Sequence, residues 1–451
     1  MKNVRKILCA MLAALVAVSA TACSGDGGNG GTASTDSAAS GETSSAAAES
    51  EPVSIELWFQ GAKEDGFLYE TAVKALEEYQ KVNPNFEVSI MPGGEADVYL
   101  QKVLMAAASD DLPEVFSATA FNMTGIPETG VLTDLTEAID SDSEWSARFT
   151  DEAWEKHFQF TDGKKYGVPT QSEIQGWFLN KRLFDEQNLE IPVTYEEWLT
   201  CIDKFNEAGI QPIAYGAVDA YSRWGFDIWF WRYGFGDNID KILSKEMKFA
   251  DFALPVYQKI DEMAKHNAFP ENVSTATCSE AIELFSAGQA AMVTTGSWEL
   301  ENLLKSPEVD NFVFSWGPEF SDSEYDQKVG TKATAWAYWA GKKASESDAK
   351  LAAVTEYLKM MSDPVVVTYL TEEKNIITAC QYDGDTSELP GLMQSLLEKK
   401  DDEYASGGEI SGFIDPSFES AYWNSVSAVI TQTATPEEAV QQLDDAMAML
   451  S

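Results

Sequence analysis

Hydrophobic positions in the segment that follows Pro52 recur with two different periods. Val53 to Phe59 is an apolar run typical of a strand, and Phe86, Val88 and Ile90 alternate with polar residues as a second strand. The segment between them, from Phe67 to Val82, repeats its apolar residues at helical spacing and is followed by Asn83-Pro84, which favours a helix end. The residues on that helical face are Tyr69, Ala72, Val73, Leu76 and Tyr79.

The pattern then repeats once. Apolar residues at helical spacing from Tyr99 to Ala107 predict a second helix, and a strand follows at about Phe116. The order β-α-β-α-β predicts an α/β fold with a mainly parallel sheet. Ligands of such sheets bind beyond the carboxyl ends of the strands, so Trp58, Gln60 and Asn122 are candidate binding residues.

Two later segments carry clear boundary signals. Thr194 followed by Glu197 predicts the capping box of a helix that begins at about Tyr195. Further on, Gly288 is expected to end a helix, and a short buried strand then leads to a Gly-Ser turn that presents Trp298.

The N-terminus is typical of an exported protein. Three basic residues precede an apolar run from Ile7 to Ala20, which is too short to span a bilayer. Small residues lead into Cys23, and this arrangement resembles the lipobox of bacterial lipoproteins, although Ala20 stands where Leu is usual. Residues 1–22 are therefore predicted to be a signal peptide and Cys23 a lipidated residue, the alternative being an ordinary secreted protein cut nearby. Residues 23–51 would be the anchor and a disordered tether, since the segment has no aromatic residue.

Charge narrows the class of partner. The 451-residue chain has 31 Lys and Arg against 74 Asp and Glu, a net charge of -43, and removal of the leader's three basic residues takes it to -46. Such a surface repels nucleic acid and would not bind an anionic membrane through basic residues. A neutral ligand suits it better than a phosphorylated one, and membrane attachment would come from the lipid anchor alone.

Features of the common catalytic and metal sites are missing from the sequence. It has only two histidines, His157 and His266, and neither H-E-x-x-H nor G-x-S-x-G. Cys201, Cys278 and Cys380 are widely spaced and odd in number, so we interpret them as structural. We expect no catalytic residue, no metal and no cofactor.

Four segments together point to a family. They are Gly-Val-Pro ending at Pro169, Gly-Trp-Phe-Leu-Asn-Lys ending at Lys181, Phe-Ser-Ala-Gly-Gln-Ala-Ala-Met ending at Met292, and Gly-Ser-Trp ending at Trp298. In this order they resemble the family 1 extracellular solute-binding proteins of ABC sugar importers, of which the maltose-binding type is the best-known relative. The resemblance extends over nearly the whole chain from Val53 onward.

The resemblance implies a two-lobed α/β fold with a ligand cleft between the lobes and three crossings of the chain. Matching motifs place the crossings near Ser172–Ile174, Met292–Gly296 and Trp336–Ala340. The N-terminal lobe would then comprise residues 52–172 and 295–337, and the C-terminal lobe residues 173–294 and 338–451. The implied partners are a carbohydrate ligand and the transmembrane subunits of an ABC permease, and the expected state is a monomer held at the outer face of the cell membrane.

The aromatic residues are the main indication in the sequence that the ligand is a sugar. A pyranose has an apolar face that flat aromatic rings can cover and a rim of hydroxyls that carboxylates, amides and Arg can satisfy. Large aromatics also fill cores, and Trp145, Trp154, Trp198, Trp229 and Trp231 are assigned to the core. Glu173 lies at the first expected crossing, where family members often place a side chain against the ligand; the alternative is an exposed acid. The full predicted ligand-binding set is Trp58, Gln60, Asn122, Glu173, Arg223, Trp224, Ser297, Trp298, Trp336 and Tyr338.

Two alternatives remain open at this point. A solute-binding protein for another solute, such as a peptide or a polyol, would have the same fold. A lipid-anchored glycosidase needs only two carboxylates about 5–10 Å apart, and in a chain with 74 acids the sequence does not identify such a pair.

Overall fold

The computed structural model describes residues 52–94, 96–123, 126, 129–149, 151–154, 158, 162–218, 221–400, 402, 404–415 and 418–450. The predicted signal peptide, the lipidated Cys23 and the tether lie outside these residues, as does His157. None of the helices in the described part of the chain is long and apolar enough to cross a membrane.

The first lobe opens with the predicted alternation of strands and helices. Its elements are β1 (Val53–Phe59), α1 (Gly66–Gln80), β2 (Phe86–Pro92), α2 (Ala96–Ala108) and β3 (Val115–Thr119), followed by α3 (Thr136–Ser141) and α4 (Ser143–Ser146). β1 pairs in parallel with both β2 and β3. The predicted β-α-β-α-β unit is therefore confirmed.

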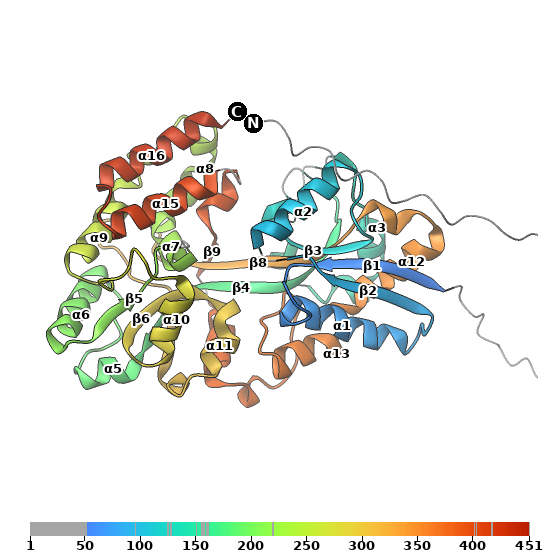
Figure 1. Cartoon of the computed structure of the whole chain (residues 1–451), viewed down its shortest axis with the longest axis horizontal. Coiled ribbons are helices and arrows are strands. Elements are labelled where there is room, and N and C mark those ends of the chain that lie inside the picture. The colour runs from blue at the N-terminus through green and yellow to red at the C-terminus, as the bar shows by residue number, and fades with distance from the viewer. Residues whose placement is uncertain are drawn as a thin grey trace, which may run out of the picture. The chain divides into compact units, whose positions relative to one another are not determined.

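Two long strands connect this lobe with the second one. β4 (Gly167–Asn180) and β8 (Val329–Ala340) pair antiparallel along most of their lengths, with register irregularities on either side of Gln171. The sheet order is β2-β1-β3-β8-β4-β6-β5. Figure 1 shows β4 and β8 side by side, reaching from the strands of the first lobe to those of the second.

The second lobe contains the other strands and most of the remaining helices. The strands are β5 (Gln211–Ala214), β6 (Ala290–Gly296), β7 (Phe312–Ser315) and β9 (Ala405–Gly407). The helices are α5 (Lys181–Glu186), α6 (Tyr195–Ala208), α7 (Trp224–Arg232), α8 (Phe235–Leu243), α9 (Leu254–Lys265), α10 (Cys278–Ser286), α11 (Leu300–Leu304), α14 (Gly391–Lys400), α15 (Glu419–Ile430) and α16 (Pro436–Met449). The predicted turn after β6 is present, with Ser297–Glu299 as a short 3-10 turn.

Each lobe has its own hydrophobic core on both faces of the sheet. In the first lobe, Leu57, Tyr338 and Tyr357 belong to the core on one face, and Phe116 and Trp339 to the core on the other. The two cores of the second lobe are centred on Trp177 with Trp229 and on Phe178 with Phe285. The core assignment of Trp145, Trp198 and Trp229 is confirmed, because each is at most 1% exposed; Trp154 and Trp231 are half-buried against these cores.

Packing divides the chain differently from the expected lobe boundaries. α12 (Asp348–Met360) and α13 (Pro364–Thr368) pack on α1 in the first lobe, where Tyr357 Oη donates to the carbonyl of Ala72 at 2.8 Å. Leu300 and Leu303 of α11, by contrast, lie in a second-lobe core. The assignment of residues 295–337 to the N-terminal lobe and of all of 338–451 to the C-terminal lobe is therefore corrected.

The expected passages near Met292–Gly296 and Trp336–Ala340 are corrected for the same reason. β6 lies between β4 and β5, so it stays in the second lobe throughout. β8 already pairs with β3 of the first lobe from Trp336 onward, so it has passed between the lobes before that residue. The chain returns to the second lobe after α13, where Cys380 belongs to a first-lobe core and Leu389 to a second-lobe core. A local motif cannot reveal such a return, because packing partners far along the chain decide it.

The capping box of α6 provides a first prediction. Thr194 Oγ1 accepts from the Glu197 amide, and the Glu197 carboxylate accepts from the Thr194 amide at 3.0 Å. Thr194→Ala should lower the free energy of unfolding by about 1 kcal/mol, as for other N-cap losses, measured by urea denaturation. The matched control is Thr200→Ala, an exposed residue of the same helix; an equal loss in both variants would contradict a capping role.

Candidate functional site

Glu173 occupies a singular place in β4. Thirteen of the fourteen residues of this strand are buried, and only Glu173 is half-buried. It follows the irregular part of the β4–β8 pairing, between Val168 in a first-lobe core and Ile174 in a second-lobe core. A carboxylate is thus placed on the inner surface where the two lobes meet.

Trp336 of β8 binds this carboxylate from the first-lobe side. Its indole Nε1 donates to Glu173 Oε1 at 3.1 Å, and the tryptophan itself is 9% exposed. The half-buried ring of Phe67, at the start of α1, packs edge-on against Trp336 with centroids 5.8 Å apart. The two rings and the carboxylate form one continuous wall.

The turn after β6 brings a second pair of rings to the other side. Ser297 Oγ accepts from the backbone amide of Ile174 at 3.2 Å, which ties this turn to the residue next to Glu173. Trp298 follows, and its ring packs edge-to-face with Trp224 at a centroid distance of 5.0 Å. Both indoles are half-buried, so part of each ring is available to another molecule.

Arg223 contacts Trp224 and connects it with Trp423 and Glu409. Its guanidinium is 4.0 Å from the Trp224 ring centroid and 4.1 Å from that of Trp423, and it donates through Nη2 to Glu409 Oε1. Trp423 Nε1 donates to the same oxygen at 3.2 Å. Arg223 is completely buried, so it orients Trp224, Trp423 and Glu409 rather than offering its charge at the surface.

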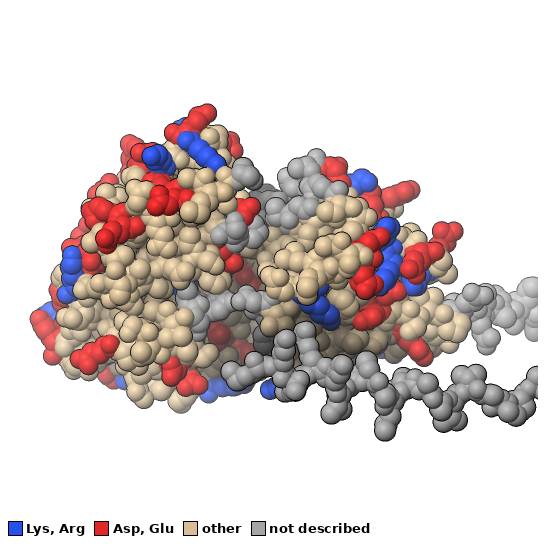
Figure 2. Space-filling model, turned by 45° about the horizontal axis from the view of Figure 1, so that its top comes forward, with Lys and Arg blue, Asp and Glu red and all other residues tan. Residues whose placement is uncertain are grey.

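The surroundings of Glu173 raise the pKa of its carboxyl group. Burial raises its pKa to about 7, and the negative charge of Glu409 adds to the rise, whereas hydrogen bonds from Trp336 and Gln175 oppose it. Burial also raises the pKa of Asp227, which Arg223 opposes. Burial lowers the pKa of Arg223, but Glu409 and Asp227 outweigh it and the net change is upward. Figure 2 shows acidic side chains in the hollow between the lobes.

Gln60, Asn122 and Trp58 lie in the first lobe at or near the strand ends where they were predicted. The backbone N–H of Gln60 donates to Ser117 Oγ at 3.1 Å, and the backbone N–H of Asn122 donates to Thr119 Oγ1 at 3.3 Å. Thr119 pairs with Trp336 across the β3–β8 ladder, so Asn122 is near this wall. Trp58 instead packs on the α2 side, where its Nε1 donates to Glu56 and Lys102 Nζ lies 3.6 Å from its ring centroid.

Tyr338 is not a binding residue in this structure, which corrects its inclusion in the predicted set. It is completely buried, and its hydroxyl donates to the backbone carbonyl of Leu68. Strand alternation places it on the same face as Trp336, but two residues deeper in the first-lobe core.

Sequence reasoning missed four contributors: Phe67, Gln175, Glu409 and Trp423. Glu409 lies 186 residues from Arg223 in the chain, and Trp423 follows on α15. Gln175 could have been found, because it lies two residues from Glu173 and therefore on the same face of β4. It is 7% exposed, and its Oε1 has no hydrogen-bond partner within the described residues.

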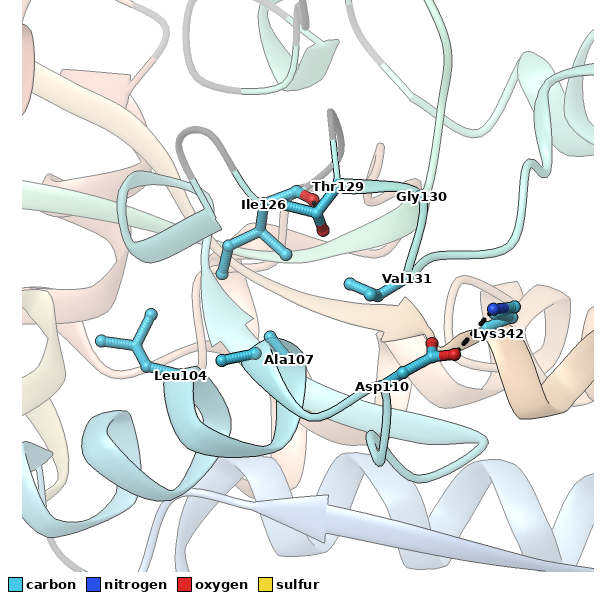
Figure 3. Close-up of a pocket in the computed structure, with 9 residues that line it drawn as sticks. Leu104, Ala107, Asp110, Ile126, Thr129, Gly130, Val131 and Lys342 are labelled. Carbon is cyan, nitrogen blue, oxygen red and sulfur yellow. Dashed lines mark hydrogen bonds and ion pairs between the residues drawn. The ribbon is translucent and has the colours of Figure 1, made fainter.

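A separate pocket of about 630 Å³ lies in the first lobe (Figure 3). Leu104 and Ala107 of α2 form one side, with Ile126 and Val131 opposite, and an ion pair of Asp110 with Lys342 at 2.7 Å lies at its edge. None of the described residues that line it is aromatic, so among them the surface that stacks on a sugar is missing.

The cysteines fit the structural role predicted for them. Cys201 and Cys380 are buried free thiols, and burial raises their pKa values to about 11 and about 12, which disfavours the reactive thiolate. Within the residues that the structure describes, no group of three or more His, Cys, Asp and Glu side chains is placed to hold a metal ion.

Comparison with known proteins agrees with this architecture. The "Multiple sugar-binding protein" of Streptococcus mutans is 20% identical over 373 residues, which cover 75% of this chain and 81% of the relative. A solved chitin oligosaccharide binding protein superposes with a TM-score of 0.76 at 18% identity, covering 88% of this chain and 98% of the other. A structure from work on xylan utilization by Caldanaerobius polysaccharolyticus superposes with a TM-score of 0.74 at 21% identity. The superposition covers 87% of this chain and 99% of the other.

The family model for the bacterial extracellular solute-binding protein matches residues 68–367, about two thirds of the chain. The match contains both β4 and β8, and with them Glu173, Trp298 and Trp336 of the site. The superposed structures are of the same two-lobed type, which confirms the predicted two-lobed α/β fold. The chain belongs to the bacterial extracellular solute-binding proteins.

Proposed function

We propose that this protein captures a carbohydrate, most suitably an oligosaccharide, outside the cytoplasm and delivers it to the permease of an ABC importer. The observation that carries the proposal is the combination of half-buried indoles and carboxylates on one surface: Trp224, Trp298 and Trp423 with Glu173 and Glu409. Rings of this kind cover the apolar face of a pyranose, and carboxylates accept its hydroxyls. The names of the relatives support the same class of ligand.

The length of the aromatic surface favours an oligosaccharide over a single sugar. Trp298 contacts Trp224, and Trp224 is linked through Arg223 to Trp423, so three indoles follow one another. Adjacent sugar rings can each use one indole. Binding alone is proposed, with no bond of the sugar made or broken.

The mechanism is closure of the two lobes around the solute. β4 and β8 carry the chain between the lobes, and Glu173 with Trp336 lies at this junction. A solute that contacts both walls only when the lobes are closed shifts the population toward the closed form. The permease would recognise that form.

Attachment to the membrane would come from Cys23. We propose that signal cleavage leaves this residue at the N-terminus with acyl chains, so that the tether holds a monomeric binding protein near its permease at the outer face of the cell membrane. Two or more acyl chains suffice for stable anchoring.

A thermal-shift screen of residues 52–451 tests the function. The panel contains xylotriose, chitotriose, maltotriose and raffinose, with sorbitol and a tripeptide as the other solute classes. A ligand at a hundredfold excess over its Kd stabilises the folded state by about 2.7 kcal/mol. A shift with a carbohydrate, recovered unchanged by chromatography, supports the proposal. A shift with sorbitol or the tripeptide alone, or hydrolysis of the sugar, contradicts it.

Trp298 provides the sharpest test of the aromatic surface. Trp298→Ala should weaken binding of the carbohydrate found in the screen by about 1–3 kcal/mol, the range for loss of an aromatic stacking partner, measured by calorimetry. The control is Trp154→Ala, another half-buried indole, which packs on Phe149 at 5.0 Å in the first lobe. Equal affinities of the Trp298 variant and the unmodified protein would remove Trp298 from the site.

Trp336 and Tyr338 form a matched pair on one face of β8. Trp336→Phe keeps a ring but removes the donor to Glu173, so affinity should fall. Tyr338→Phe removes the hydrogen bond to Leu68, so the free energy of unfolding should fall by about 1 kcal/mol with affinity unchanged. Calorimetry and urea denaturation of both variants measure the two effects, and the reverse pattern would contradict the assignment.

A further inference from the structure

Glu173 is surrounded by groups that leave its charge poorly compensated. Trp336 of β8 and Gln175 of β4 each provide a hydrogen bond, and Lys332, which is opposite the neighbouring Ile174, is paired with Asp402 at 3.0 Å. On the β6 side, the turn presents the uncharged Ser297. The second-lobe charge that acts on Glu173 is that of Glu409, so the residues around Glu409 decide how well Glu173 is compensated.

The region around Glu409 contains one cation, Arg223, and three acids that act on it. Arg223 is bound to Glu409 and lies between two indoles, and Asp227 and Glu419 are its other acidic neighbours. Since Arg223 is completely buried and already bound to Glu409, Glu409 rather than Glu173 has it as counter-ion. Of these acids, Glu409 acts on Glu173 and raises its pKa.

We propose that Glu173 exchanges a proton when the site fills, so that the protein binds its carbohydrate more tightly above neutral pH than below it. This inference rests on the proposed function. Sugar hydroxyls donate to a carboxylate, and together with the bond from Trp336 they favour the ionised form in the complex. The ionised carboxylate can accept on both oxygens, whereas a protonated Glu173 has one oxygen taken up as a donor, so added hydroxyl donors favour loss of the proton.

The sign of the pH dependence follows from linkage. Burial raises the pKa of free Glu173 to about 7, and bound hydroxyls lower it. Between the bound and free pKa values binding releases a proton, so affinity rises with pH by up to tenfold per unit, and it levels off above about pH 8. The stability of the ligand-free fold has the opposite dependence, because the folded pKa of this acid lies above its unfolded value: this contribution is present below pH 4.5 and is lost as pH rises through 7.

A ligand-free titration tests the protonation directly. The carboxyl 13C signals of the labelled protein are followed from pH 4 to 9 in unmodified protein, Glu173→Gln and Glu409→Gln. We expect the Glu173 signal to have a midpoint near 7 that disappears in Glu173→Gln, which keeps an oxygen to accept from Trp336, and that moves to lower pH in Glu409→Gln, which removes the like charge. The Asp227 signal should persist in Glu173→Gln. A Glu173 midpoint below 5 would overturn the proposal.

Calorimetry then tests the coupling to binding. The tightest binder among xylotriose, chitotriose, maltotriose and raffinose is titrated at pH 5.5 to 8.5 in two buffers of different ionisation enthalpy. Tighter binding at higher pH, with proton release that Glu173→Gln abolishes, is the expected result. Affinity that is independent of pH, or that falls as pH rises, contradicts the proposal. If none of these sugars binds, the proposed function fails, and the ligand-free titration alone decides whether Glu173 exchanges a proton at neutral pH.

Discussion

The antiparallel pairing of β4 with β8 is the constraint on which the rest of this structure depends. These strands connect the two lobes, and β4 is buried almost throughout, so its backbone groups must pair with those of its neighbours. The pairing is irregular around Gln171, just before Glu173, and at this point the strand leaves one hydrophobic core and enters the next. Glu173 is the half-buried residue at that position, and its carboxylate accepts a hydrogen bond from Trp336. The site is therefore a consequence of how the sheet passes between the lobes.

The charges around Glu173 are incompletely compensated. A buried carboxylate with a raised pKa, a second acid nearby and an arginine bound to the second acid rather than the first do not form a well-compensated core. Incompletely compensated charges of this kind are typical of functional sites in otherwise well-packed proteins. The Arg223 cluster has the complementary role, since the guanidinium fixes two indoles and one carboxylate in positions that flexible side chains would not hold alone.

Much of the fold could be predicted because its signals are local. The alternation from Val53 to Phe116, the Thr194 capping box and the turn that presents Trp298 each depend on residues within a few positions. The candidate site likewise contains residues with local sequence signals and residues without them. Glu173, Trp224, Ser297, Trp298 and Trp336 were predicted from motifs, and short contacts connect them in the structure, whereas Glu409 and Trp423 reach Arg223 from nearly two hundred residues away. Tyr338 was misassigned because strand alternation gives the face of a residue but not its depth, and the lobe boundaries were misassigned because α12 and α13 return to pack on α1.

A crystal structure of residues 52–451 with the carbohydrate selected by the screen tests the central claim most directly. We expect a sugar ring against Trp298, a neighbouring ring within reach of Trp224 or Trp423, and a hydroxyl within hydrogen-bond distance of a Glu173 carboxylate oxygen. A sugar bound instead in the pocket beside Leu104 and Val131, or contacting one lobe only and away from Glu173, would contradict it.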